Sequence, residues 1–76
     1  MRIAEYIEIE PRLCNGKPVI EGTRIPVTVI VDMLSYGDTM ETIQAKFPEL
    51  SQRHIIAALN YCHTMLENSD IEAVAV

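Results

Sequence analysis

The 76-residue chain contains no tryptophan and few other aromatic residues, with one phenylalanine and three tyrosines. Hydrophobic residues nevertheless make up 49% of the sequence, so aliphatic side chains must form the core. A chain of this length forms one small domain that buries only about two thirds of its unfolded surface. Small domains often gain stability from a partner. The composition therefore favours an assembly over an isolated monomer.

Basic residues are scarce. Six lysines and arginines stand against eleven acidic residues, which gives a formal net charge of −5. Such a charge repels nucleic acid overall. No apolar run reaches the roughly 18 residues of a membrane span, and the N-terminal segment MRIAEYIEIE lacks the apolar stretch of a signal peptide. The sequence therefore predicts a cytoplasmic protein that is not bound to a membrane.

The residues of common catalytic and metal sites are also sparse. Cys14 and Cys62 form no Cys-x-x-Cys pair and are expected to be free thiols. His54 and His63 are nine residues apart, on opposite sides of a helix, and cannot share a metal ion within one chain. Cys14 near Lys17 is a candidate nucleophile, but no histidine lies close in sequence. We therefore expect no catalytic residue, metal or cofactor, and a thiol-dependent enzyme is the weakest hypothesis.

The N-terminal quarter has the pattern of a β-hairpin. Residues 3–9, IAEYIEI, alternate apolar and charged side chains from Tyr6 onward, which predicts a strand with one covered face. Asn15-Gly16 is a turn signal, and PVIE after it predicts a second strand. The hairpin is expected over residues 5–21.

The segment GKPVIEGTRIPV, residues 16–27, restricts its backbone tightly. Pro18 and Pro26 limit φ, and Gly22 permits a turn that a residue with a Cβ resists. We interpret the segment as a strut that holds the hairpin on the following helix. Arg24 within it is expected to pair with Glu21 or Asp32 rather than with a ligand.

A first helix is predicted from about residue 26 to 36, ending at Gly37. It carries one apolar stripe through Val27, Ile30, Val31 and Leu34, and a second on nearly the opposite side through Val29, Met33 and Tyr36. Because a helix that is apolar on two sides is buried on two sides, we expect a homodimer or another protein partner. The predicted interface consists of Val19, Ile20, Arg24, Ile25, Val29, Met33 and Tyr36.

Two more helices follow. Asp38 is the expected N-cap of the second, with Glu41 closing a capping box, and Pro48 ends it. Its predicted inward stripe is Met40, Ile43 and Phe47. Ser51 is expected to cap a third helix over residues 52–67. The predicted core stripe of that helix is Ile55, Leu59, Cys62 and Leu66, with Arg53, Ala57, Asn60 and Thr64 on the opposite face.

This order of helices is that of a helix-turn-helix unit with the third helix as reader. Its outer face offers side chains that can contact bases, and Lys46 could reach a phosphate. The candidate DNA-binding residues are Lys46, Gln52, Arg53, Asn60 and Thr64. Three-helix packing is also a common way to build a small core, and a single positive charge on the reading helix is low for a DNA-binding protein. Both interpretations stay open.

Several short motifs of the chain resemble the family called domain of unknown function 433. They are Gly16-Lys17-Pro18-Val19-Ile20, Gly22-Thr23-Arg24-Ile25-Pro26-Val27, Gly37, Phe47-Pro48-x-Leu50 and Ile55-x-Ala57-Ala58-Leu59-x-Tyr61. The resemblance covers about residues 7–62. It implies a small helical domain of homeodomain-like or winged-helix-like type with short N-terminal strands. Some members resemble VapB-type antitoxins, whose partners resemble PIN-domain ribonucleases. The resemblance supplies no catalytic residues.

Together these features predict a mainly α fold: a three-helix, helix-turn-helix domain with an N-terminal β-hairpin over residues 1–67, and a tail over residues 68–76. The first functional hypothesis is an antitoxin-like regulator that binds a PIN-like ribonuclease toxin, with operator DNA as a further ligand. The alternative is a dimeric protein-interaction module without DNA binding. The tail, NSDIEAVAV from residue 68, is expected to be disordered or to become ordered on a partner.

Overall fold

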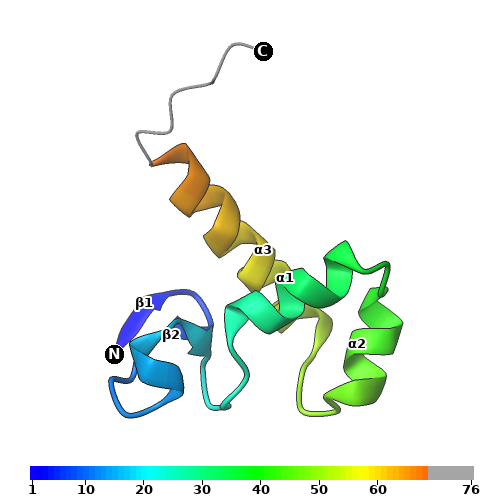
Figure 1. The fold of residues 1–76 in the computed structure, drawn as a ribbon, viewed down its shortest axis with the longest axis horizontal. Coiled ribbons are helices and arrows are strands. Elements are labelled where there is room, and N and C mark those ends of the chain that lie inside the picture. The colour runs from blue at the N-terminus through cyan, green and yellow to red at the C-terminus, as the bar shows by residue number, and fades with distance from the viewer. Residues whose placement is uncertain (69–76) are drawn as a thin grey trace.

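The computed structural model describes residues 1–68, and the predicted tail lies outside the described residues from residue 69 onward. A small antiparallel sheet is followed by three helices, as Figure 1 shows, which confirms the predicted mainly α fold with an N-terminal hairpin. The elements are β1 (Arg2–Ala4), β2 (Ile7–Glu8), the 3₁₀ turn η1 (Cys14–Gly16), β3 (Val19–Ile20), α1 (Val27–Ser35), α2 (Met40–Lys46) and α3 (Gln52–Glu67).

The sheet has the strand order β1-β2-β3, and each neighbouring pair is antiparallel. The prediction of one strand over residues 3–9 is wrong, because the chain reverses at Glu5 and Tyr6 so that Ala4 pairs with Ile7. Tyr6 adopts a φ of 62° there. This left-handed conformation is uncommon for a residue with a bulky side chain. The segment therefore forms two strands of a tight hairpin.

The Asn15-Gly16 turn lies inside a longer connection between β2 and β3 and does not close a tight hairpin. Cys14, Asn15 and Gly16 all have positive φ, at 51°, 57° and 77°. Residues 9–18 therefore form a loop around the η1 turn before β3 pairs with β2 through Ile7 and Ile20. The predicted hairpin pairing is present, but its connection differs from the predicted one.

The segment of residues 16–27 has the expected character of a strut. The backbone N–H of Ile20 donates to the carbonyl of Ile25 over 2.9 Å, and that of Val27 donates to Pro18 over 3.0 Å. Between these bonds the Thr23 hydroxyl donates to the Ile20 carbonyl over 2.7 Å and accepts from the Ile25 N–H over 3.0 Å. The closed loop joins β3 directly to the first turn of α1.

The helices follow the predicted boundaries closely. α1 begins at Val27 after the N-cap Pro26, and α3 covers residues 52–67 as predicted. Ser51 caps α3, and His54 completes the capping box from its Nδ1 atom.

The predicted cap of α2 is wrong by one residue. Thr39 is the N-cap and forms a capping box with Thr42, so neither Asp38 nor Glu41 has its predicted role. The Asp38 carboxylate instead accepts the Thr42 hydroxyl over 2.9 Å. The Thr39 hydroxyl accepts from the Thr42 N–H, and the Thr42 hydroxyl accepts from the Thr39 N–H, so the two threonines cap the helix reciprocally.

The core joins all three helices to the sheet through buried aliphatic side chains. They are Ile7, Val19, Ile20, Ile25, Val27, Ile30, Ile43, Leu50, Ile55, Ala57 and Ala58. The predicted core stripe of α3 is partly wrong, because Leu59 and Leu66 are 40% and 65% exposed. Ala57, predicted on the outer face, is buried instead. Small alanine side chains let the hairpin and α1 approach α3 closely, whereas the larger leucines point away from these contacts.

Candidate protein-interaction site

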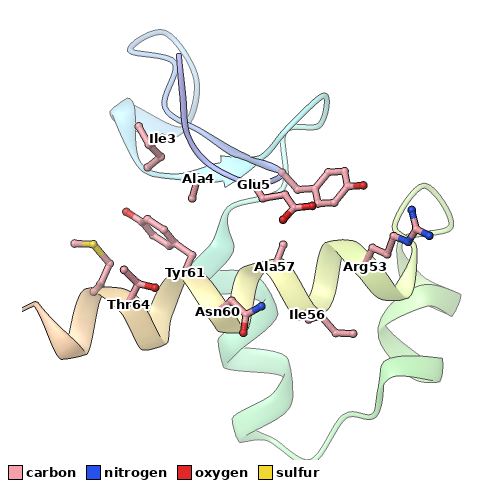
Figure 2. Close-up of a pocket in the computed structure, with 11 residues that line it drawn as sticks. Ile3, Ala4, Glu5, Arg53, Ile56, Ala57, Asn60, Tyr61 and Thr64 are labelled. Carbon is pink, nitrogen blue, oxygen red and sulfur yellow. The ribbon is translucent and has the colours of Figure 1, made fainter.

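A groove separates the β1–β2 hairpin from α3, with a volume of about 600 Å³ (Figure 2). One wall is the hairpin and the other is one side of α3. The groove is lined by Ile3, Ala4, Glu5, Tyr6, Arg53, Ile56, Ala57, Asn60, Tyr61, Thr64 and Met65. Concave apolar surfaces with a few polar groups are the usual form of binding sites.

The position of the hairpin wall is set by contacts at the N-terminal end of α3. The Tyr6 and His54 rings lie 5.0 Å apart, centroid to centroid, at an angle of 56°. The His54 ring is held in turn by the capping box, in which the Ser51 N–H donates to Nδ1 over 2.9 Å. The left-handed turn at Tyr6 and the cap of α3 therefore fix the width of the groove at this end.

Apolar side chains form the inner part of the groove. Ala57 is buried at its base, and Tyr61 extends from α3 toward Ile3 and Ala4, as Figure 2 shows. Sequence reasoning placed Ala57 on a solvent face and assigned no role to Tyr61. The sequence feature that could have indicated both roles is the small side chain at position 57, because the hairpin crosses the helix there.

Polar groups border this apolar base. Arg53 and Glu5 lie toward one end, and Asn60 and Thr64 follow along α3 (Figure 2). Within residues 1–68 the exposed Arg53 guanidinium makes no hydrogen bond or ion pair. Its charge is therefore available to an acidic group of a ligand.

The five candidate DNA-binding residues are all exposed but do not form one cluster. Arg53, Asn60 and Thr64 line the groove together, whereas Gln52 does not. Lys46 lies at the end of α2 with its Nζ atom 5.7 Å from the centroid of the Phe47 ring.

The predicted partner interface is narrowed by the burial of three of its members. Val19 and Ile20 have no exposed surface and Ile25 has 8%, because all three pack within the chain's own core. They cannot contact a partner while the domain is folded. The other predicted interface residues, Arg24, Val29, Met33 and Tyr36, keep exposed or half-buried side chains, and Tyr36 is 87% exposed.

The expected ion pair of Arg24 with Glu21 or Asp32 does not form. Glu21 instead lies 3.5 Å from Arg2, and the exposed Arg24 side chain has no ion-pair partner among residues 1–68. Arg2 reaches Glu21 because the chain reversal at Tyr6 brings β1 back beside β2, which is the neighbour of β3 in the sheet. That reversal was not predicted.

A second, smaller hollow of about 350 Å³ lies along the C-terminal half of α3. Pro18 and Val27 form one side of it, and side chains of α3 form the other. The α3 residues that line it are Tyr61, Cys62, Met65 and Leu66. α3 therefore carries hollows on two of its sides, and its C-terminal turns extend beyond the other helices in Figure 1.

Residues 1–68 contain no helix that is long and apolar enough to cross a membrane. No three side chains of histidine, cysteine, aspartate or glutamate in the same range come together as metal ligands. Cys14 and Cys62 are unpaired and half-buried, and the Cys14 thiol lies 3.6 Å from the Arg24 carbonyl oxygen.

Comparison with known proteins agrees with this architecture. No protein with a curated description matches the chain. The chain is similar to the crystal structure of a DUF433 member protein from Anabaena variabilis, with a TM-score of 0.77 and 32% sequence identity. The match covers 82% of this chain and 61% of that one, so this chain corresponds to less than two thirds of that protein. The family model described as a protein of unknown function (DUF433) matches residues 7–62, and the chain therefore belongs to this family.

Proposed function

We propose that the protein is an antitoxin-like regulator that binds a PIN-like ribonuclease through the groove between the β1–β2 hairpin and α3. The observation that carries the proposal is the groove itself, with its apolar base and an unpaired Arg53 at its border. A segment of a protein partner can bury apolar side chains against Tyr61 and Ala57. Polar groups of the partner would pair with Arg53 and Asn60, in the way that helix-binding grooves use a few polar contacts for orientation.

The charge of the chain suits a nuclease partner. The net charge is −5, whereas a ribonuclease must attract a polyanionic substrate. An acidic protein is steered toward such a surface and competes there with RNA. This complementarity favours inhibition by occupation of the substrate path, which is the role of an antitoxin.

The test is capture of partners from an extract of the native cells with the tagged protein, followed by mass spectrometry. We expect a small nuclease to co-purify with the wild-type chain. Thr64→Arg places a long charged side chain in the groove and should abolish recovery. Ala45→Arg, at an exposed position of α2, is the matched control and should recover the nuclease.

Two results would contradict the proposal. Recovery of the protein without any nuclease would remove the antitoxin role, and equal recovery by Thr64→Arg would remove the groove as the binding surface. A nuclease that co-purifies is then assayed on RNA with increasing amounts of the regulator. Full inhibition at equal molar amounts is expected.

Operator DNA is a second candidate ligand, because α2, residues 47–51 and α3 have the order of a helix-turn-helix unit. Arg53 at the start of α3 is then the residue expected to contact a base or phosphate. Binding to DNA from the protein's own promoter should weaken steeply with salt and weaken further in Arg53→Ala. Absence of binding at low salt would leave the alternative, a dimeric interaction module without a DNA role.

A further inference from the structure

The outward side of α3 carries a row of exposed side chains, most of them apolar. Ile56 and Leu59 are 42% and 40% exposed, and Leu66 is 65% exposed. His63, also exposed, completes the row. The spacing of three, four and three residues between these positions is that of a coiled-coil seam. Such a seam fits another helix better than it fits a flat surface or an extended peptide.

We propose that the seam, defined as Ile56, Leu59, His63 and Leu66, binds the same seam of a second copy in an antiparallel helix pair. Ile56 then packs against Leu66 of the partner subunit, and Leu59 packs against His63 of the partner subunit. The two-fold axis crosses the seam midway between Leu59 and His63. Each contact occurs twice, as a symmetric dimer requires.

The charges beside the seam determine whether the two helices pair in antiparallel or parallel orientation. Arg53, Asn60 and Glu67 are spaced seven residues apart and therefore form one row next to the seam. An antiparallel pair brings Arg53 close to Glu67 of the partner subunit, and it does so twice. Asn60 approaches its own counterpart, where two amides can exchange hydrogen bonds. A parallel pair sets identical residues at the same level and offers no such ion pairs, so charge complementarity selects the antiparallel second copy.

The side chains required for this pairing are accessible. Within residues 1–68, Arg53 forms no ion pair, and Glu67 contacts only the exposed His63 ring, at 3.5 Å. Ile55, Ala57 and Ala58 bind α3 to the body of the domain from the opposite side. The seam is short, so we expect a dissociation constant on the order of micromolar. The pair is then weaker than the large interfaces of obligate dimers.

Self-association is independent of the proposed ribonuclease, since it requires only the purified chain. It nevertheless uses Arg53, Ile56 and Asn60, which also line the groove. A partner in the groove and a second copy on the seam therefore compete at this edge. The helix pair also covers Arg53 and Asn60, two of the positions with which α3 would contact DNA.

The test is sedimentation equilibrium of the purified full chain over a wide concentration range. The wild type should be a monomer–dimer equilibrium. Leu59→Glu, which puts a charge into the apolar seam, should raise the dissociation constant at least about thirtyfold. Ala45→Glu makes the same charge change at an exposed position of α2 and should leave it within about twofold. Circular dichroism checks that both variants keep their helical content.

A charge exchange tests the direction of the pair. Arg53→Glu alone and Glu67→Arg alone should each raise the dissociation constant about tenfold, because each creates two like-charge contacts. The double variant restores opposite charges and should return to within about threefold of the wild type.

Three outcomes would overturn the proposal. The first is a wild-type chain that stays monomeric at all concentrations. The second is a double variant no better than either single charge change. The third is a dimer that survives Leu59→Glu but is lost in Met33→Glu, which would place the interface on the second stripe of α1.

Discussion

Ile30 is a residue on which the fold depends heavily. Its side chain is fully buried on α1 and belongs to the cluster that joins the sheet to all three helices. Ile30→Ala should lower the free energy of unfolding by about 2–5 kcal/mol through lost burial and the cavity left behind. Urea denaturation followed by circular dichroism measures this change. The exposed Thr28→Ala on the same helix should change stability by less than about 0.5 kcal/mol, and an equal loss in both variants would contradict the proposed core.

Gly22 supports the strut through its backbone alone. It has a φ of +78°, and no atom lies within 4 Å of the position a Cβ would take. Gly22→Ala should therefore cost only the strain of a left-handed alanine, about 1 kcal/mol, without a steric clash. Urea denaturation measures that loss, and a loss several times larger would mean that the loop closed by Thr23 cannot form around alanine. Gly22→Asn, which tolerates this conformation better, should recover part of the stability.

Left-handed residues also show what the sequence could and could not predict at this scale. Gly22 and Asn15-Gly16 were recognised as turns, because these residue types favour positive φ. Tyr6 was not, since tyrosine seldom adopts a φ of 62° and carries no local turn signal. Its conformation is compensated by a tertiary contact, the packing of its ring on His54, which lies far away in the sequence. One wall of the candidate site was therefore not predictable.

At the scale of elements, the start of α2 depends on a threonine pair. Thr39 accepts from the Thr42 N–H over 3.2 Å, and its own N–H donates to the Thr42 hydroxyl over 2.8 Å. Thr39→Ala should lower the free energy of unfolding by about 1 kcal/mol, the usual effect of losing an N-cap. Glu41→Ala, which removes the predicted box partner, should change it by less than about 0.5 kcal/mol. Thermal denaturation of both variants makes the comparison, and the reverse order would support a cap at Asp38.

The extent of each helix was predictable, but the burial of its faces was less so. Proline, glycine and cap residues are local signals, so the ends of α1 and α3 agree with the sequence to within a residue. Burial depends on what packs against the helix. On α3 the hairpin covers Ala57, and this leaves Leu59 and Leu66 exposed despite their greater hydrophobicity. The groove and the seam both result from this arrangement, in which a small side chain is buried and larger ones are exposed.

At the scale of the whole molecule, the exposed seam is the surface on which we propose that a partner binds. A short aliphatic chain has few ways to cover all its apolar side chains, and within residues 1–68 most of the large exposed ones lie on α3, with Met1 and Tyr36 elsewhere. The association stays a prediction, and the surface proposed for it is the seam on α3 instead of α1 and the strut, which the sequence favoured. Val19, Ile20 and Ile25 are apolar and were predicted at the interface, because their pattern does not show that they pack into the chain's own core.

Association through the seam predicts that stability depends on protein concentration. Because only the folded chain pairs, each tenfold increase above the dissociation constant should add about 1.4 kcal/mol per mole of dimer to the free energy of unfolding. The urea midpoint should rise accordingly across a hundredfold range of concentration. Leu59→Glu should shift this dependence to at least about thirtyfold higher concentrations, whereas Ala45→Glu should keep it where it is in the wild type. The contradicting result is a wild-type urea midpoint that stays constant at protein concentrations above the measured dissociation constant. It would show that the paired state is no more stable than the single folded chain, in conflict with a helix pair that buries the seam.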